Sequence, residues 1–152
     1  MQTQAQQTES TTTRSSASEF SIVPQDRLDA LLKSAPVVRM MLENSLREAG
    51  DFRPEDVLAQ LRGGFLQLWL VYTGMRVDAV VVTKVDIRPL CKVGMIVYCT
   101  GEDRERWVHH VETLEDWFRE HGCSRVQVWA RKGWQRVLKD WQWTHILLEK
   151  AI

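Results

Sequence analysis

The sequence predicts a single α/β domain with a mixed, mostly antiparallel central sheet flanked by helices, in the order β-α-α-α-β-β-β-α-β-α-β. Three observations support this prediction. Apolar residues recur at helical spacing in the first part of the chain, follow a strand pattern in the middle, and return to helical spacing after residue 101. Glycine and proline mark the segment ends. The length of 152 residues suits one domain with a substantial core.

The composition excludes several classes of protein. The chain is 44% hydrophobic and has 20 basic and 20 acidic residues, and this zero net charge argues against a general nucleic-acid or membrane binder. No apolar run approaches the roughly 20 residues that a membrane helix needs. A secretion signal is not recognisable. The three cysteines lack framework spacing, which indicates reduced thiols. We therefore expect a cytoplasmic protein.

The first 19 residues differ from the rest of the chain. They contain only Met, Ala and polar residues, mostly Gln, Ser and Thr. Such a segment cannot bury enough apolar surface to offset the entropy lost on ordering. Residues 1–19 are predicted to be a disordered tail, and residues 20–152 to be the folded domain.

A strand and three helices are expected first. Pro24 ends the strand, and Asp26 can cap the first helix. Pro36 begins the second helix and Gly50 ends it, whereas Pro54 lies in the first turn of the third. The expected segments are residues 20–23, 26–33, 37–49 and 52–64.

Three strands then follow at residues 66–72, 77–87 and 92–99. The run AVVVTKV in the second is apolar on both faces, as in a central strand. Gly94 in the third marks a bulge or a close approach of another group. These strands are predicted to form an antiparallel meander.

The last part of the chain returns to helical spacing. Trp107, Val111, Leu114 and Phe118 lie at positions i, i+4, i+7 and i+11, which predicts one long helix that Gly122 ends. A strand at residues 125–130, a short helix at 133–140 and a final strand at 143–150 complete the domain.

This order resembles the GNAT (Gcn5-related N-acetyltransferase) fold, over about residues 20–152. The segment GCSRVQVWARKGWQRVLKDWQWTHILLEK is similar to the C-terminal half of that family, with its strand, short helix and closing strand. The sequence pattern LEDWFREHGC…VWARKGWQRVL…LLEK resembles small GNAT-like proteins of tailed bacteriophages. Some of these proteins are encoded among head, portal or internal-virion genes. The resemblance implies a phage-type accessory protein in the host cytoplasm or the virion.

The resemblance also identifies a candidate cofactor loop. GNAT enzymes carry a Q/R-x-x-G-x-G/A loop whose backbone N–H groups reach the pyrophosphate of coenzyme A. Here the loop falls at residues 100–106, TGEDRER, where Gly101, Arg104 and Arg106 are the candidate acetyl-CoA ligands. Acidic residues stabilise a first helical turn but repel an anion, so the loop predicts a good helix start and a poor phosphate site. The three acids are Glu102, Asp103 and Glu105.

No catalytic residue is predicted. A GNAT general acid is often a tyrosine on the short C-terminal helix, but no tyrosine follows Tyr98 here. The main interpretation is therefore a GNAT-like protein degenerate for acetyl transfer, which acts through a phage structural or host protein partner. The alternative is an acetyl-CoA-dependent N-acetyltransferase with a non-standard pyrophosphate loop, in which the acceptor enters near Tyr98 and Trp129.

A second alternative is a small nucleic-acid-binding protein. The segment ARKGWQRVLKDWQW interleaves basic and aromatic residues, a pattern that stacks on bases. The same spacing fits a helix with a core stripe and a solvated basic face, which the neutral net charge favours. The candidate residues are Trp129, Arg131, Lys132, Trp134 and Arg136.

Other side chains have structural interpretations. Adjacent helical residues point about 100° apart, so His109 and His110 are not expected to bind one metal ion together. We expect His110 beside the core, His109 in solvent, and Cys99 as a buried structural thiol. Seven tryptophans need partners for their indole N–H groups if all are buried, so Trp69 and Trp129 are expected at an exposed protein interface.

Overall fold

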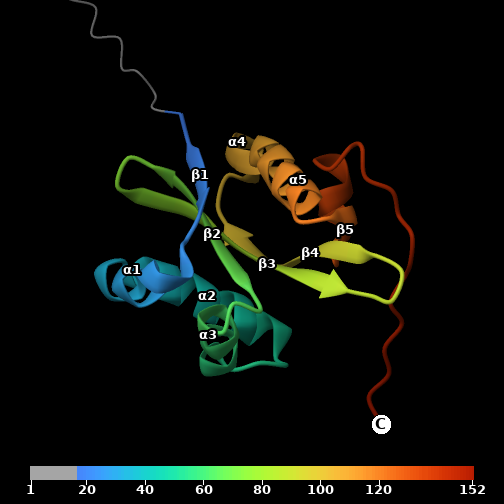
Figure 1. Cartoon of the computed structure of the whole chain (residues 1–152), viewed down its shortest axis with the longest axis horizontal. Helices are drawn as coiled ribbons and strands as arrows, with labels where there is room; N and C mark the ends of the chain where they lie inside the picture. Colours follow the sequence, from blue (N-terminus) through green and yellow to red (C-terminus); the bar gives the residue numbers. More distant parts are fainter. Residues whose placement is uncertain (1–16) are drawn as a thin grey trace, which may run out of the picture.

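The computed structural model describes residues 17–152 and contains one five-stranded sheet in the order β1-β2-β3-β4-β5 (Figure 1). The first four strands pair antiparallel, whereas β4 and β5 pair parallel. The predicted α/β fold with a mostly antiparallel mixed sheet is confirmed. The strands are β1 Glu19–Ile22, β2 Gln67–Thr73, β3 Arg76–Ile87, β4 Lys92–Gly101 and β5 Cys123–Val128.

Helices cover both faces of the sheet. The helices α1, α2 and α3 lie on one face, and α4 and α5 lie on the other (Figure 1). None of the helices in residues 17–152 is long and apolar enough to cross a membrane. The helical segments are η1 Gln25–Arg27, α1 Leu28–Ser34, α2 Pro36–Ala49, α3 Pro54–Arg62, α4 Arg104–Trp107, η2 Val108–His110, α5 Val111–Glu120 and η3 Lys132–Arg136.

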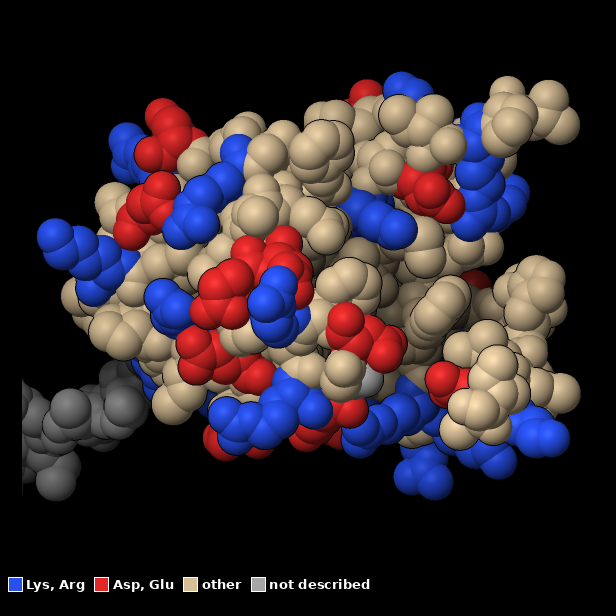
Figure 2. Space-filling model, turned by 90° about the horizontal axis from the view of Figure 1, so that it is seen from below, with Lys and Arg blue, Asp and Glu red and all other residues tan. Residues whose placement is uncertain are grey.

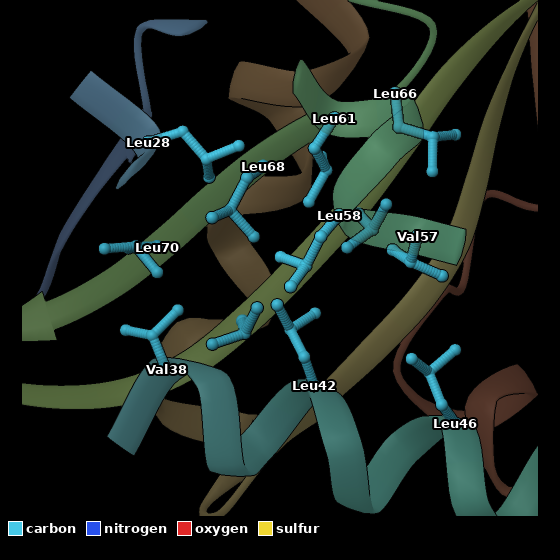
Figure 3. Packing of buried hydrophobic residues seen from close by; sticks show 12 residues of the cluster. Leu28, Val38, Leu42, Leu46, Val57, Leu58, Leu61, Leu66, Leu68 and Leu70 are labelled. Atoms are coloured by element: carbon cyan, nitrogen blue, oxygen red, sulfur yellow. The ribbon is translucent and has the colours of Figure 1, made fainter. Parts of the chain in front are cut away.

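The larger core lies between the sheet and α1–α3 (Figure 3). On α2, Val38, Leu42 and Leu46 recur every four residues, so they form one buried stripe. The strand β2 alternates, because successive side chains point to opposite faces of a sheet. Leu68 packs in this core, while Trp69 packs in the core under α5.

Trp69 is buried, with 2% of its surface exposed, and the expectation that it lies at an exposed interface is wrong. Its ring stacks on Phe20 at 5.1 Å between centroids. Its Nε1 donates a hydrogen bond of 2.9 Å to Thr83 Oγ1, which donates in turn to Gln67 Oε1 at 3.1 Å. The face opposite the Leu row of β2 is not open, because α5 covers it.

The variant Thr83→Val tests this buried network. Valine has nearly the same shape but cannot bond Trp69 Nε1, so we expect a loss of about 1–3 kcal/mol in the free energy of unfolding. Urea denaturation measures the difference. Thr113→Val, on the exposed side of α5, is the matched control and is expected to leave stability within about 0.5 kcal/mol of the native value.

The segment between β4 and β5 is not the single long helix that the sequence predicts. It consists of α4, η2 and α5 in succession. Asp103 has a left-handed backbone with φ of 49°, and Trp107, whose Nε1 donates a 2.7 Å hydrogen bond to Glu102 O, is 7% exposed. We infer that burying Trp107 against the end of the sheet interrupts the regular helix at this residue.

The C-terminal elements also differ from the prediction. The short helix expected at residues 133–140 is the 3₁₀ segment η3, and the strand expected at residues 143–150 is not formed. A segment forms a strand only where its backbone pairs with that of a neighbouring strand. Here the chain beyond η3 runs away from the sheet (Figure 1).

Candidate functional site

The strands β4 and β5 diverge part-way along their length. Their pairing begins at Lys92 and Cys123 and ends at Ile96 and Val128, whereas β4 continues to Gly101. The register between β3 and β4 shifts at Thr83, which indicates a bulge in β4 next to the Ile96–Val128 pair. The backbone groups on that edge of residues 97–101 therefore have no strand partner.

The divergence opens a groove beneath α4, η2 and α5. Its volume is about 680 Å³, including the part open to solvent. The lining is mainly apolar and comes from segments far apart in the sequence. The lining residues include Phe20, Val97, Tyr98, Cys99, Trp107, His110, Leu114, Val128, Trp129 and Trp134.

Arg104 packs against Trp134, which lines this groove. Its guanidinium carbon is 4.8 Å from the centroid of the Trp134 ring, and its Nη2 donates to Gly133 O at 3.4 Å. Within residues 17–152, its Nε is the buried side-chain nitrogen that has no hydrogen-bond partner. A buried N–H of a cation without a partner is costly, so this guanidinium would be stabilised by a nearby anion.

The other two predicted cofactor ligands are held differently. Gly101 pairs with Ala79, and a Cβ added at Gly101 would lie 2.5 Å from the Ala79 Cβ, so sheet packing accounts for this glycine. Arg106 is exposed, and its charge acts on Asp78. Burial raises the pKa of Asp78, but hydrogen bonds from Thr73 and Arg76, with the charge of Arg106, outweigh it and lower that pKa. The carboxylates of Glu102, Asp103 and Glu105 are exposed.

Tyr98 lines the groove at the bulge and also packs against the core under α1–α3. Burial raises the pKa of its phenol, and the negative charge of Asp51 raises it further. The phenol is therefore protonated at neutral pH and can donate a proton.

Cys99 is a mostly buried thiol in the groove, as expected. Burial raises its pKa to about 12, although the charge of Arg104 acts in the opposite direction. The thiolate is the nucleophilic form of cysteine, so Cys99 is a poor nucleophile at neutral pH.

Alkylation tests this property of Cys99. At pH 8 we expect iodoacetamide to modify Cys99 at least about 100-fold more slowly in the folded protein than in urea, because the thiolate is scarce. Peptide mass spectrometry measures the rate at each cysteine. Equal rates in the two states would contradict the buried, protonated thiol.

His110 is half-buried and His109 is exposed, which confirms both expectations. The His110 ring stacks on Phe20, and its Nε2 lies 3.0 Å from Ser18 Oγ. Burial lowers the pKa of His110, as does the charge of His109, while Ser18 acts in the opposite direction. The described part of the chain contains no cluster of three or more His, Cys, Asp or Glu side chains that could hold a metal ion.

These contacts revise the expected N-terminal tail. Ser18 bonds His110 and Glu19 begins β1, because the apolar Phe20 beside them is anchored between Trp69 and His110. The prediction for residues 1–16 lies outside the described residues. Phe20 is also a groove residue that the sequence analysis missed, since no local pattern links it to η2.

The basic aromatic segment is divided between the groove and the surface. Trp134 packs at the groove, 6.3 Å from Trp107 between ring centroids, whereas Trp129 is 79% exposed, as expected. Arg131 pairs with Glu48 at 3.4 Å. Lys132 and Arg136 are exposed on η3. On the face in Figure 2, basic and acidic side chains are interspersed among a larger area of uncharged surface, unlike an extended basic footprint for nucleic acid.

The fold was compared with known proteins. No family model matches the sequence, and no curated protein matches it significantly. Among solved structures, the GCN5-related N-acetyltransferase from Ralstonia eutropha JMP134 matches with a TM-score of 0.63 and 21% identity, over 90% of this chain and 99% of that one. The chain has the GNAT acetyltransferase fold.

Two further structures show the same GNAT fold. A predicted acetyltransferase from Clostridium acetobutylicum, determined with acetyl-CoA, matches with a TM-score of 0.63 and 14% identity, over 88% of this chain and 96% of that one. An aminoglycoside acetyltransferase from an uncultured soil metagenomic sample matches with a TM-score of 0.65 and 9% identity, over 89% and 96%.

Proposed function

We propose that the protein is an acetyl-CoA-dependent N-acyltransferase whose cofactor lies along β4 in the groove between β4 and β5. The observation that carries this proposal is the divergence of two parallel strands beside a buried arginine nitrogen without a partner. The GNAT fold and the acetyl-CoA in the similar structure from Clostridium acetobutylicum support it.

The residues of the groove fit the chemical parts of this cofactor. Acetyl-CoA, when bound, would supply an acyl thioester, and coenzyme A would leave as the thiol. The free edge of residues 97–101 offers backbone donors and acceptors to an amide-containing arm, and the apolar lining excludes water. Arg104 would bind a phosphate oxygen by a charge-assisted hydrogen bond. The exposed acids of the loop weaken this attraction, so we expect affinity in the micromolar range or weaker.

Tyr98 is the candidate proton donor in the reaction. Tyr98 lines the groove at the bulge, and its protonated phenol would give its proton to the leaving thiolate. The phenolate would recover a proton from the nitrogen of the attacking neutral amine, so the step balances. The acceptor amine enters beside the exposed Trp129. The protonated Cys99 favours direct transfer to the amine over an acyl-cysteine intermediate.

The first experiment is a calorimetric titration of the full chain with acetyl-CoA, followed by an assay of thiol release with a panel of primary amines. We expect binding and amine-dependent release. Absence of heat at millimolar acetyl-CoA would overturn the proposal.

The variant Tyr98→Phe separates chemistry from binding. We expect kcat to fall by about 10²–10⁴-fold with the KM for acetyl-CoA unchanged, because general acid catalysis contributes about that factor. An unchanged kcat would remove Tyr98 from the proposed mechanism.

A protein-interaction role is the second candidate, and the exposed Trp129 favours it because tryptophan is enriched at interfaces. The phage structural or host protein partner expected from the sequence stays a prediction. Co-purification of such a partner with the native protein, but not with Trp129→Ser, is the test.

A further inference from the structure

The strand β1 lies at one edge of the sheet and is the shortest of the five strands (Figure 1). It has four residues and pairs with β2, and its outer edge has no strand partner within the described residues. Short edge segments open locally at a lower free energy than inner strands. The position of β1 therefore depends on side-chain contacts with the helical layer that covers it.

His110 makes such contacts from η2. Its ring stacks on Phe20 at 5.4 Å between centroids, and its Nε2 lies 3.0 Å from Ser18 Oγ. Phe20 also stacks on Trp69 of β2, at 5.1 Å. The Phe20 ring is thus held by one side chain from the sheet and one from η2. We refer to the contacts of His110 with Ser18 and Phe20 as the His110 latch.

The His110 latch forms part of the wall of the groove. Phe20 and His110 both line the groove, and Phe20 is the lining residue that β1 supplies. An apolar wall buries the surface of a bound ligand and excludes water from it. Detachment of β1 would remove the Phe20 ring and open this side of the groove to solvent.

We propose that His110 is a positioning residue for acetyl transfer and acts through Phe20. The neutral imidazole keeps Phe20 in the wall of the groove, whereas the protonated imidazole releases β1 and weakens the binding of acetyl-CoA. Because acetyl-CoA is the ligand of the groove only under the proposed function, this role of His110 rests on that function. The protein would then bind its cofactor less tightly in mildly acidic conditions.

The surroundings of His110 disfavour a positive charge on its ring. Burial is the largest cause that lowers the pKa of His110, and His109, whose ring centroid is 4.0 Å away, lowers that pKa further. Ser18 acts in the opposite direction. The titratable phenol and thiol in the groove, Tyr98 and Cys99, have raised pKa values and carry no charge at neutral pH.

The charged groups on the adjoining elements do not compensate for this burial. None of them is a cause of the shifted pKa of His110, and all but two are exposed to solvent, which screens their charges. These groups are Glu19 on β1, Arg104, Glu105 and Arg106 on α4, and Glu112 and Glu115 on α5. Of the two half-buried ones, Arg104 is held on Trp134, and Glu115 accepts a hydrogen bond from Trp141.

The direction of the pH effect follows from the lowered pKa. A free histidine has a pKa of about 6.5, and the pKa of His110 in the latch lies below that value. The latch therefore contributes its full stability above about pH 6.5. It loses this stability as the pH falls from there through the lower pKa of the folded state.

The first test measures acetyl-CoA binding by calorimetry at about pH 7.5 and about pH 5, which lie on either side of the histidine titration. It compares the native chain with His110→Gln, because glutamine can still bond to Ser18 but has no titrating group. On acidification we expect the Kd of the native chain to rise about 3–10-fold more than that of His110→Gln, the range of one hydrogen bond. The titration of the cofactor's own phosphates is common to both chains and cancels.

His109→Gln is the matched control, because it removes the exposed neighbour and leaves the latch intact. It should keep most of the extra pH dependence, since burial is the larger cause of the lowered pKa of His110. An equal rise in Kd for the native chain and His110→Gln would overturn the proposal.

A second readout does not need the cofactor. NMR signals of the Phe20 ring and the Ile22 methyl groups report directly on β1. On acidification we expect them to move toward their unfolded positions in the native chain and to stay in place in His110→Gln. Signals that stay in place in both chains would overturn the latch. Signals that move only in the native chain, with no acetyl-CoA binding at either pH, would support the latch and overturn the proposed function.

Discussion

Replacing Gly94 by alanine is expected to destabilise the protein by about 1–3 kcal/mol, because that is the typical cost of overpacking a filled core. A Cβ at this position in β4 would lie 2.5 Å from two atoms of the Phe118 ring. Phe118 is 0% exposed, so the ring has no free space to move into. The strand and α5 would have to separate. Urea denaturation measures the loss.

Gly133→Ala is the control for this experiment. Gly133 lies in η3, and a Cβ added there meets no atom within 4 Å. We expect its stability to match the native protein or to exceed it slightly, because alanine reduces the entropy of the unfolded chain. Equal stability of the Gly94 and Gly133 variants would show that β4 and α5 are not in the close contact described.

Replacing Arg104 by alanine is expected to weaken acetyl-CoA binding by about 10–100-fold, since a hydrogen bond to a charged group contributes roughly 1.5–3 kcal/mol. The Nε of Arg104 is buried without a partner, and the guanidinium is held against Trp134. The group is therefore positioned before the ligand arrives, which lowers the entropy cost of binding. Calorimetry of the variant measures the change in Kd.

Arg106→Ala provides the matched comparison, because it removes the same charge two positions away. Arg106 is exposed and acts on Asp78, so we expect a change in Kd below about threefold, in the range of a screened surface charge. Equal losses in the two variants would indicate that only the net charge of the loop matters, contrary to the assigned role of Arg104.

The parts of the fold predicted well are those with local signals. Pro36 begins α2 and Pro54 begins α3, because proline lacks the amide N–H that the first helical turn leaves unpaired. Gly50 ends α2, because its left-handed φ of 77° does not continue a right-handed helix. The position of Gly94 against another group was also visible in the sequence, since a glycine inside an apolar strand is otherwise unfavourable.

The parts predicted poorly depend on tertiary contacts. The burial of Trp69 depends on the helix that covers its face of the sheet, and the break at Trp107 depends on the contact of that side chain with Val71 and Ala79. For the candidate site, residues 100–106 join β4 to α4, and sequence analysis did not distinguish Arg104 from Arg106 as a ligand. The burial of Arg104 Nε and the contact of its guanidinium with Trp134 distinguish it from the exposed Arg106.

The parallel pairing of β4 with β5 has a consequence for the order of folding. The strands β2, β3 and β4 are joined by short turns, so their contacts are local and the meander is expected to form early. The strand β5 pairs only after residues 102–122 have closed a long connection, whose entropy cost must be met first. The groove is therefore completed last, and a weakened variant would lose the groove while the meander and its helical layer persist.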